Sequence, residues 1–225
     1  MEDIRTFSKK RLLLFGSWIG LSSLLFAHPL SALVRMSISN DNASYILFIP
    51  LISAWILLLE HHEIFQNLAS DLALGGGLFI GAVTVGLAAA VAGSDSLLDL
   101  RLSGYVLSLL LFWVSGFAML FGKNASKAGY FPLSFLFLMV PLPNFVLGHV
   151  IYLLQAGSAW ITGVFFDLLG VPSLREGFVF HLARINIEIA KECSGIRSSM
   201  ALVILALVVA HFRLKSFWRQ SLFVA

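Results

Sequence analysis

The chain has 225 residues, of which 59% are hydrophobic and only 12% are charged, a balance far outside that of soluble globular domains. The net charge of +3 comes from short basic clusters beside apolar runs, a pattern that orients membrane proteins and argues against a nucleic-acid-binding face. A single cysteine excludes an internal disulfide and a thiolate-rich metal site.

Apolar runs define the predicted spans, because a helix needs about 20 mostly apolar residues to cross a bilayer. The first run follows a basic segment and resembles a cleavable signal peptide, but more spans follow and no small-x-small site ends it, so we interpret it as a retained anchor. In the third run, Gly75, Gly76 and Gly77 lack the context of a phosphate loop and indicate close helix contact. The six runs lie at roughly residues 12–34, 45–60, 71–92, 102–121, 144–169 and 195–212.

The segment 130–143 interrupts this series. It is apolar but contains Pro132, Pro141 and Pro143, and proline removes a backbone donor and clashes with the preceding helical turn. We therefore expect a short or re-entrant segment instead of a continuous span.

Basic clusters predict the orientation. The cluster at 9–11 precedes the first span and places the N-terminus in the cytoplasm, and four crossings return Lys123 and Lys127 to that side. The residues Arg213, Lys215 and Arg219 follow the last span and belong on the same side. If Lys127 and Arg213 are both cytoplasmic, the last span must begin outside, so residues 129–192 must cross the membrane an odd number of times. One crossing by residues 144–169 meets this requirement.

Residues 171–192 predict a piece outside the bilayer. Phe178, Phe180 and Leu182 alternate with other residues, and a second alternation runs over 187–189 after a break at 184–186, as in a small β-hairpin on the outer surface. The predicted fold is thus an all-α polytopic membrane protein in one domain over 1–225, with about six transmembrane helices, one short or re-entrant segment and a small extracytoplasmic hairpin.

Cys193 follows this hairpin, and Ser194 with Gly195 opens the last apolar run. A helix N-terminus favours the thiolate and lowers the pKa of a cysteine, and Arg197, about one turn on, would add positive charge. This environment suits an activated nucleophile. The alternative is a structural cysteine, with Ser194 as a helix cap and Arg197 as an anchor at the membrane interface.

The histidines offer few partners for this thiol. His211 lies 18 residues beyond Cys193, about 27 Å along a helix, and cannot pair with it. His181 could approach if the hairpin folds over the helix end, and is otherwise an exposed strand residue. His149 faces an internal cavity or makes a helix-packing hydrogen bond. The cluster at 60–63, E-H-H-E, contains metal-ligand types, but a solvated interfacial loop is favoured, so we expect no metal and no cofactor.

Several strings resemble one family. The string E-C-S-G-I-R-S at 192–198 is similar to the signature of the exosortase/archaeosortase family, a group of multispan membrane cysteine transpeptidases. Further similar strings occur in the family's order. They are S-Y-I-L-F-I-P-L-I-S-A at 44–54, V-P-L-P at 140–143, L-Q-A-G-S-A at 154–159, and G-V-P followed by R-E-G at 170–177.

The resemblance implies that Cys193 is the nucleophile, with Glu192, Ser194, Gly195 and Arg197 as its supporting motif. It would attack the C-terminal sorting tail of an exported protein at the outer face of the cytoplasmic membrane, and pass the protein to a lipid or surface-polymer acceptor. Family members also carry an arginine and then a histidine or second arginine in later helices. The printed chain ends at Ala225, so the resemblance implies that the family's C-terminal helices are missing.

Two other function classes compete with this reading. One is a non-catalytic membrane protein that binds sorting tails or supports a surface-polymer assembly. The other, a small transporter, is weaker, because few ionisable groups lie inside the predicted spans and no paired broken helices mark a midplane site.

Overall fold

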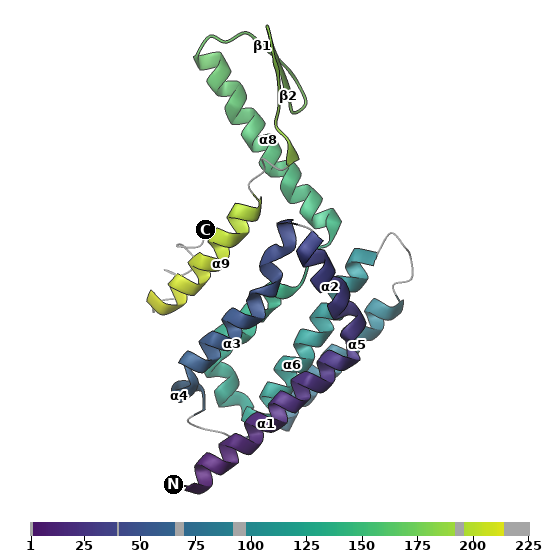
Figure 1. Cartoon of the computed structure of the whole chain (residues 1–225), viewed down its shortest axis with the longest axis vertical. Helices are drawn as coiled ribbons and strands as arrows, with labels where there is room; N and C mark the ends of the chain where they lie inside the picture. The colour runs from purple at the N-terminus through teal and green to yellow at the C-terminus, as the bar shows by residue number, and fades with distance from the viewer. Residues whose placement is uncertain (1, 40, 66–69, 92–97, 192–195, 214–225) are drawn as a thin grey trace. The chain divides into compact units, whose positions relative to one another are not determined.

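The computed structural model describes residues 2–39, 41–65, 70–91, 98–191 and 196–213 (Figure 1). The chain forms two compact units, residues 1–141 and 142–225. The described part of the first unit is helical, and the second unit combines helices with a small sheet. The predicted class, an all-α polytopic membrane protein with a small β element, is confirmed.

Three helices are long and apolar enough to cross a membrane among the described residues. They confirm the third, fourth and fifth predicted spans, and they are α5 (Leu72–Val91), α6 (Leu98–Ala128) and α8 (Asn144–Leu168). Their composition explains their length, because apolar residues continue for about the 20 positions that span a bilayer.

The first predicted span is bent. It consists of α1 (Glu2–Leu25) and α2 (Ala27–Ser39), whose axes differ by 81°. Pro29 in the first turn of α2 has no N–H for the carbonyl of Leu25, and such a missing bond is a common cause of a sharp kink. The prediction of one uninterrupted run over 12–34 missed this break.

The second predicted span is shorter than expected, whereas the sixth has about the predicted length. Residues 45–60 divide into a 3₁₀ helix, η1 (Asp41–Leu47), and α3 (Ile49–Leu59), which starts with Pro50 in its first turn. Proline favours this position because its missing N–H has no helical partner there in any case. A short helix, α4 (His61–Ile64), follows. The last run forms α9 (Ile196–Arg213).

Helices α5 and α6 approach each other through small residues. A Cβ atom added to Gly75 would lie 2.2 Å from the Cγ of Met119 and 2.9 Å from its backbone nitrogen. Nearer the other ends of the helices, a Cβ on Gly86 would lie 2.8 Å from the Oγ of Ser108. Small residues permit this close packing of helices in membranes. The predicted close contact is confirmed for Gly75, whereas a Cβ on either of the next two glycines meets nothing within 4 Å.

Helix α1 crosses α6 in the opposite direction. The Nη1 of Arg11 donates to the carbonyl of Leu120 at 2.9 Å, and the Nε1 of Trp18 donates to the carbonyl of Phe112 at 2.8 Å. The two helices are thus antiparallel. The basic start of α1 consequently lies at the same end of the first unit as Lys123.

The proline-containing segment is discontinuous, as predicted. It forms α7 (Tyr130–Phe135), a 3₁₀ turn η3 (Leu136–Met139) and an extended stretch. Two buried serines of other helices hold it: the hydroxyl of Ser53 in α3 donates to the carbonyl of Pro132, and that of Ser103 in α6 donates to the carbonyl of Pro141, each at 2.7 Å.

In the second unit, α8 precedes an antiparallel sheet in the order β1-β2-β3. The strands are β1 (Ser173–Glu176), β2 (Val179–Leu182) and β3 (Asn186–Glu188). Gly177 at φ 63° occupies the first position of the two-residue turn between β1 and β2, where tight hairpins place a glycine. The predicted hairpin corresponds to β2 and β3, and β1 is an additional strand.

Candidate active site

The nucleophile motif lies between two described elements. Glu192, Cys193, Ser194 and Gly195 are outside the described residues, and of Arg197 the structure describes the backbone, as the second residue of α9. Helix α9 begins three residues after the cysteine, which agrees with the predicted helix start beside the motif. The structure therefore shows how the chain is held up to residue 191, just before this motif.

Gln155 connects α8 to the chain that leads into the motif. Its side chain is 5% exposed, and its Nε2 donates to the carbonyl of Ile189 at 2.8 Å. Ile189 lies four residues before Cys193. A buried amide or carbonyl without a partner is costly, so this bond stabilises the exit of the sheet against α8.

Apolar packing attaches the sheet to the same helix. Phe180 in β2 is 1% exposed and clusters with Ala159 of α8 and with Ile189. The ring of Phe166 meets that of Phe180 edge-on, with 5.3 Å between centroids and 81° between planes, a favourable geometry for aromatic pairs. The small side chain of Ala159, which is fully buried, leaves room for this ring. One face of the sheet therefore packs against α8.

The opposite face of the sheet carries a polar trio. His181 follows Phe180 in β2 and, because side chains alternate along a strand, it points away from α8. Its Nδ1 lies 3.0 Å from the Oδ1 of Asn186, and its Nε2 lies 3.5 Å from the Oε2 of Glu176. Both ring nitrogens thus have partners within the sheet, which favours the structural interpretation of this histidine.

The other histidines considered as thiol partners or metal ligands interact with residues close to them in the chain. In α8, the Nδ1 of His149 is 3.0 Å from the carbonyl of Phe145, so the interaction stays within the helix. His211 lies 15 residues beyond Ile196 in an unbroken α9, about 22 Å along the axis. In α4, the rings of His61 and His62 are 4.0 Å apart. In the described ranges, no three histidine, cysteine or acidic side chains group as metal ligands would.

The role of Gln155 was not predicted from the sequence, although this residue lies in the string L-Q-A-G-S-A. The available signal was a glutamine near the middle of a mostly apolar span, since polar residues within membrane helices usually have a specific partner. The structure also gives roles to two other strings. Ser53 belongs to the string at 44–54, and Pro141 begins the pair of prolines in V-P-L-P.

The R-E-G string shapes the first turn of the sheet. The Nε of Arg175 donates to the carbonyl of Gly177 at 3.0 Å, and its guanidinium carbon lies 5.7 Å from the centre of the Phe180 ring. Arginine thus covers the ring that docks on α8, in the geometry of a cation–π contact. The strings at 154–159 and 170–177 therefore supply contacts that join α8 and the sheet into one platform, whose last described residues precede the nucleophile motif in the chain.

Comparison with known families gives one match. The family model described as transmembrane exosortase matches residues 35–225. No curated protein and no solved structure matches the chain significantly. The matched range includes every string quoted above, both proline-holding serines and the nucleophile motif.

Proposed function

The chain belongs to the transmembrane exosortase family, and we propose that it is a membrane-embedded cysteine transpeptidase. Its substrates are exported proteins with a C-terminal sorting tail, composed of a short recognition motif, one transmembrane helix and a basic end. It cleaves the tail and transfers the protein to a lipid or surface-polymer acceptor. The observation that carries the proposal is the string E-C-S-G-I-R-S at 192–198 within a family match over 35–225.

In the proposed reaction, the thiolate of Cys193 attacks the carbonyl carbon of the scissile peptide bond. The tetrahedral intermediate collapses with cleavage of the C–N bond, and the leaving amine takes up a proton and departs with the tail. The exported protein remains as a thioester on the sulfur. A nucleophilic group of the acceptor then attacks the thioester carbonyl, loses its proton and releases the thiolate.

The surroundings of the motif support this chemistry in two ways. The start of α9 three residues beyond the cysteine supplies the positive end of a helix dipole, which favours a thiolate and a developing oxyanion. The platform held by Gln155 and Phe180 fixes the chain on the other side. A positioned nucleophile reacts faster than a mobile one, because much of its orientational entropy is already lost.

The proposed location is the cytoplasmic membrane, with the N-terminus in the cytoplasm and Cys193 outside. The contact of Arg11 with Leu120 supports this assignment, since it brings the cluster at 9–11 and Lys123 to one end of the first unit. Two basic clusters at one end satisfy the positive-inside rule together. Sorting tails would then present their recognition motif on the side where Cys193 lies.

The test is a reporter protein that carries a sorting tail, produced in cells with the full gene product. Immunoblotting separates the uncleaved from the processed reporter. We expect processing with the natural protein and none with Cys193→Ser, while Lys191→Ala, a change at an exposed neighbour, processes the reporter normally. Membrane fractionation confirms that all three proteins insert equally.

Unchanged processing by Cys193→Ser at normal insertion contradicts the proposal. It would favour the non-catalytic alternative, in which the chain binds tails or supports a surface-polymer assembly.

A further inference from the structure

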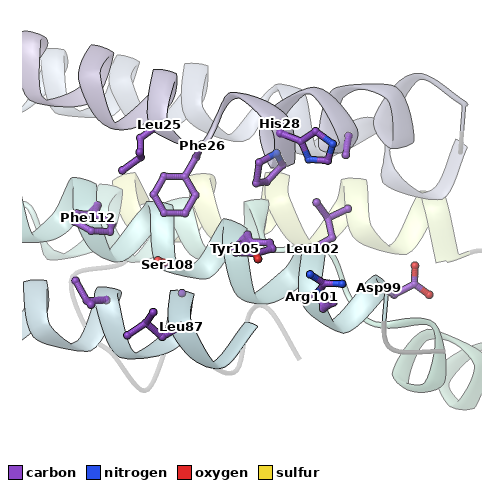
Figure 2. Close-up of a pocket in the computed structure, with 14 residues that line it drawn as sticks. Leu25, Phe26, His28, Leu87, Asp99, Arg101, Leu102, Tyr105, Ser108 and Phe112 are labelled. Carbon is purple, nitrogen blue, oxygen red and sulfur yellow. The ribbon is translucent and has the colours of Figure 1, made fainter. Parts of the chain in front are cut away.

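The first unit contains a cavity of about 680 Å³ that the proposed chemistry does not use. It lies between the α1–α2 bend on one side and α5 with α6 on the other (Figure 2). Sites for small ligands commonly have volumes of about 300–1,000 Å³. The cavity is therefore large enough for a small ligand.

The lining changes character along the cavity. At one end it is formed by apolar side chains, among them Phe26, Leu87 and Phe112, and at the other by His28, Arg101 and Asp99 (Figure 2). Arg101 is half-buried. Such a lining matches an amphiphile, with an apolar chain at one end and a polar group at the other.

The dimensions match one leaflet of a bilayer. Arg101 and Phe112 are 11 residues apart on α6, which places them about 16 Å apart along the helix axis. Half of a hydrocarbon core of about 30 Å is about 15 Å. Because Arg101 is also near the beginning of the apolar span Asp99–Ala128, the polar end lies where a lipid headgroup would.

A single extended hydrocarbon chain is much thinner than a helix, which is about 10–12 Å across with its side chains. The guanidinium of Arg101 also suits phosphate, to which arginine donates two parallel hydrogen bonds.

We infer that this cavity is a binding site for one phospholipid, with an acyl chain between the α1–α2 bend and α5, and the phosphate at Arg101. The site does not depend on the reactivity of Cys193. It assigns a function to the bend at Pro29, because the bend forms one wall of the cavity.

The test is photo-crosslinking in nanodiscs with phosphatidylglycerol, phosphatidylethanolamine and diacylglycerol, each with a diazirine near the end of one acyl chain. Mass spectrometry locates the labelled residues. We expect both phospholipids to label residues around Leu87 and Phe112, and we expect unlabelled phospholipid to reduce this labelling by competition. Diacylglycerol, which has no phosphate, should label these residues about tenfold less, because it lacks one charge-assisted contact.

Variants separate this site from the general lipid annulus. Arg101→Gln should reduce cavity labelling by phospholipid about tenfold, and Arg101→Lys should lie between this variant and the natural protein, because the charge remains but the paired hydrogen bonds are lost. Leu87→Trp should fill the cavity and remove the label, whereas Leu72→Trp, at an exposed leucine on the same helix outside the cavity, should not. Cys193→Ser should label like the natural protein.

Equal labelling of the cavity by diacylglycerol and phospholipid, or unchanged labelling in Leu87→Trp, would overturn the inference. The competition between lipids on the natural chain decides the question even where a variant fails to fold. Loss of reporter processing in Cys193→Ser is a separate result, so failure of this site and failure of the transpeptidase proposal are distinguishable.

Discussion

The side-chain amide of Gln155 donates a 2.8 Å hydrogen bond to the carbonyl of Ile189, and this bond joins the middle of α8 to the strand exit four residues before Cys193. The two residues are 34 positions apart in the chain. Through this bond, a membrane helix limits where the cysteine motif can begin. A change at Gln155 should therefore affect the reaction without touching the reacting atoms.

We expect Gln155→Leu to lower reporter processing and to destabilise the second unit. The substitution leaves the buried carbonyl of Ile189 without its donor, which costs about 1–3 kcal/mol. Reporter immunoblots and thermal unfolding in detergent measure the two effects. The matched control is Thr162→Val on the same helix, since the Thr162 hydroxyl donates to the carbonyl of Ser158 in the preceding turn of that helix. Equal behaviour of the two variants would refute the positioning role of Gln155.

The serine that holds Pro141 offers a second prediction. Ser103→Ala removes the 2.7 Å bond to a proline carbonyl and should reduce the free energy of unfolding by about 1–3 kcal/mol. Ser115→Ala on the same helix is the control, because the buried Ser115 hydroxyl has no hydrogen-bond partner within the described part of the chain. We expect no loss from that control. If Ser115→Ala lowered the free energy of unfolding as much as Ser103→Ala, the bond from Ser103 to Pro141 would not be the cause of the loss.

Gly122 permits a break inside α6. Its backbone has φ 83° and ψ −178°, a region open essentially to glycine alone. Gly122→Ala should therefore destabilise the protein by about 1–3 kcal/mol. Gly81→Ala on α5, where an added Cβ meets nothing within 4 Å, should be neutral or stabilising because alanine favours helix. Thermal unfolding compares the two, and a stabilising Gly122→Ala would contradict the observed backbone.

The single cysteine permits a direct test of orientation. In intact spheroplasts, a membrane-impermeant maleimide should label Cys193 in the natural protein. A Lys127→Cys change in a Cys193→Ser background should react only after permeabilisation, since Lys127 follows Lys123 at the exposed end of α6 with the predicted cytoplasmic side chains. The reverse labelling pattern would overturn the assigned topology.

Composition and apolar periodicity were sufficient to predict the class of fold and the three long spans, since hydrophobic length alone decides whether a helix can cross a bilayer. The bend at Pro29 and the helix start at Pro50 were missed because the spans were predicted from apolar length, and a single proline does not change the apolar length of a run although it removes a backbone hydrogen bond. The prolines of 130–143 were more obvious, since three of them lie in one short segment.

The candidate site was less predictable. The nucleophile came from the resemblance of a short string, and its structure lies outside the described residues. Alternation predicted β2 and β3, yet β1 was missed because its residues Ser173–Glu176 do not alternate in polarity. The bond from Gln155 to Ile189 depends on folding the sheet back onto α8, a tertiary contact that no local pattern contains.

The central claim is that Cys193 forms a thioester with the exported protein, and detection of that adduct tests it most directly. Membranes with the natural protein and a tail-bearing reporter are quenched in acid, and the adduct is mapped by mass spectrometry with and without hydroxylamine. We predict a hydroxylamine-labile adduct on the peptide that contains Cys193, ending at the cleavage point of the reporter. Processing of the reporter at the full rate in Cys193→Ser, with no adduct in either protein, would contradict it.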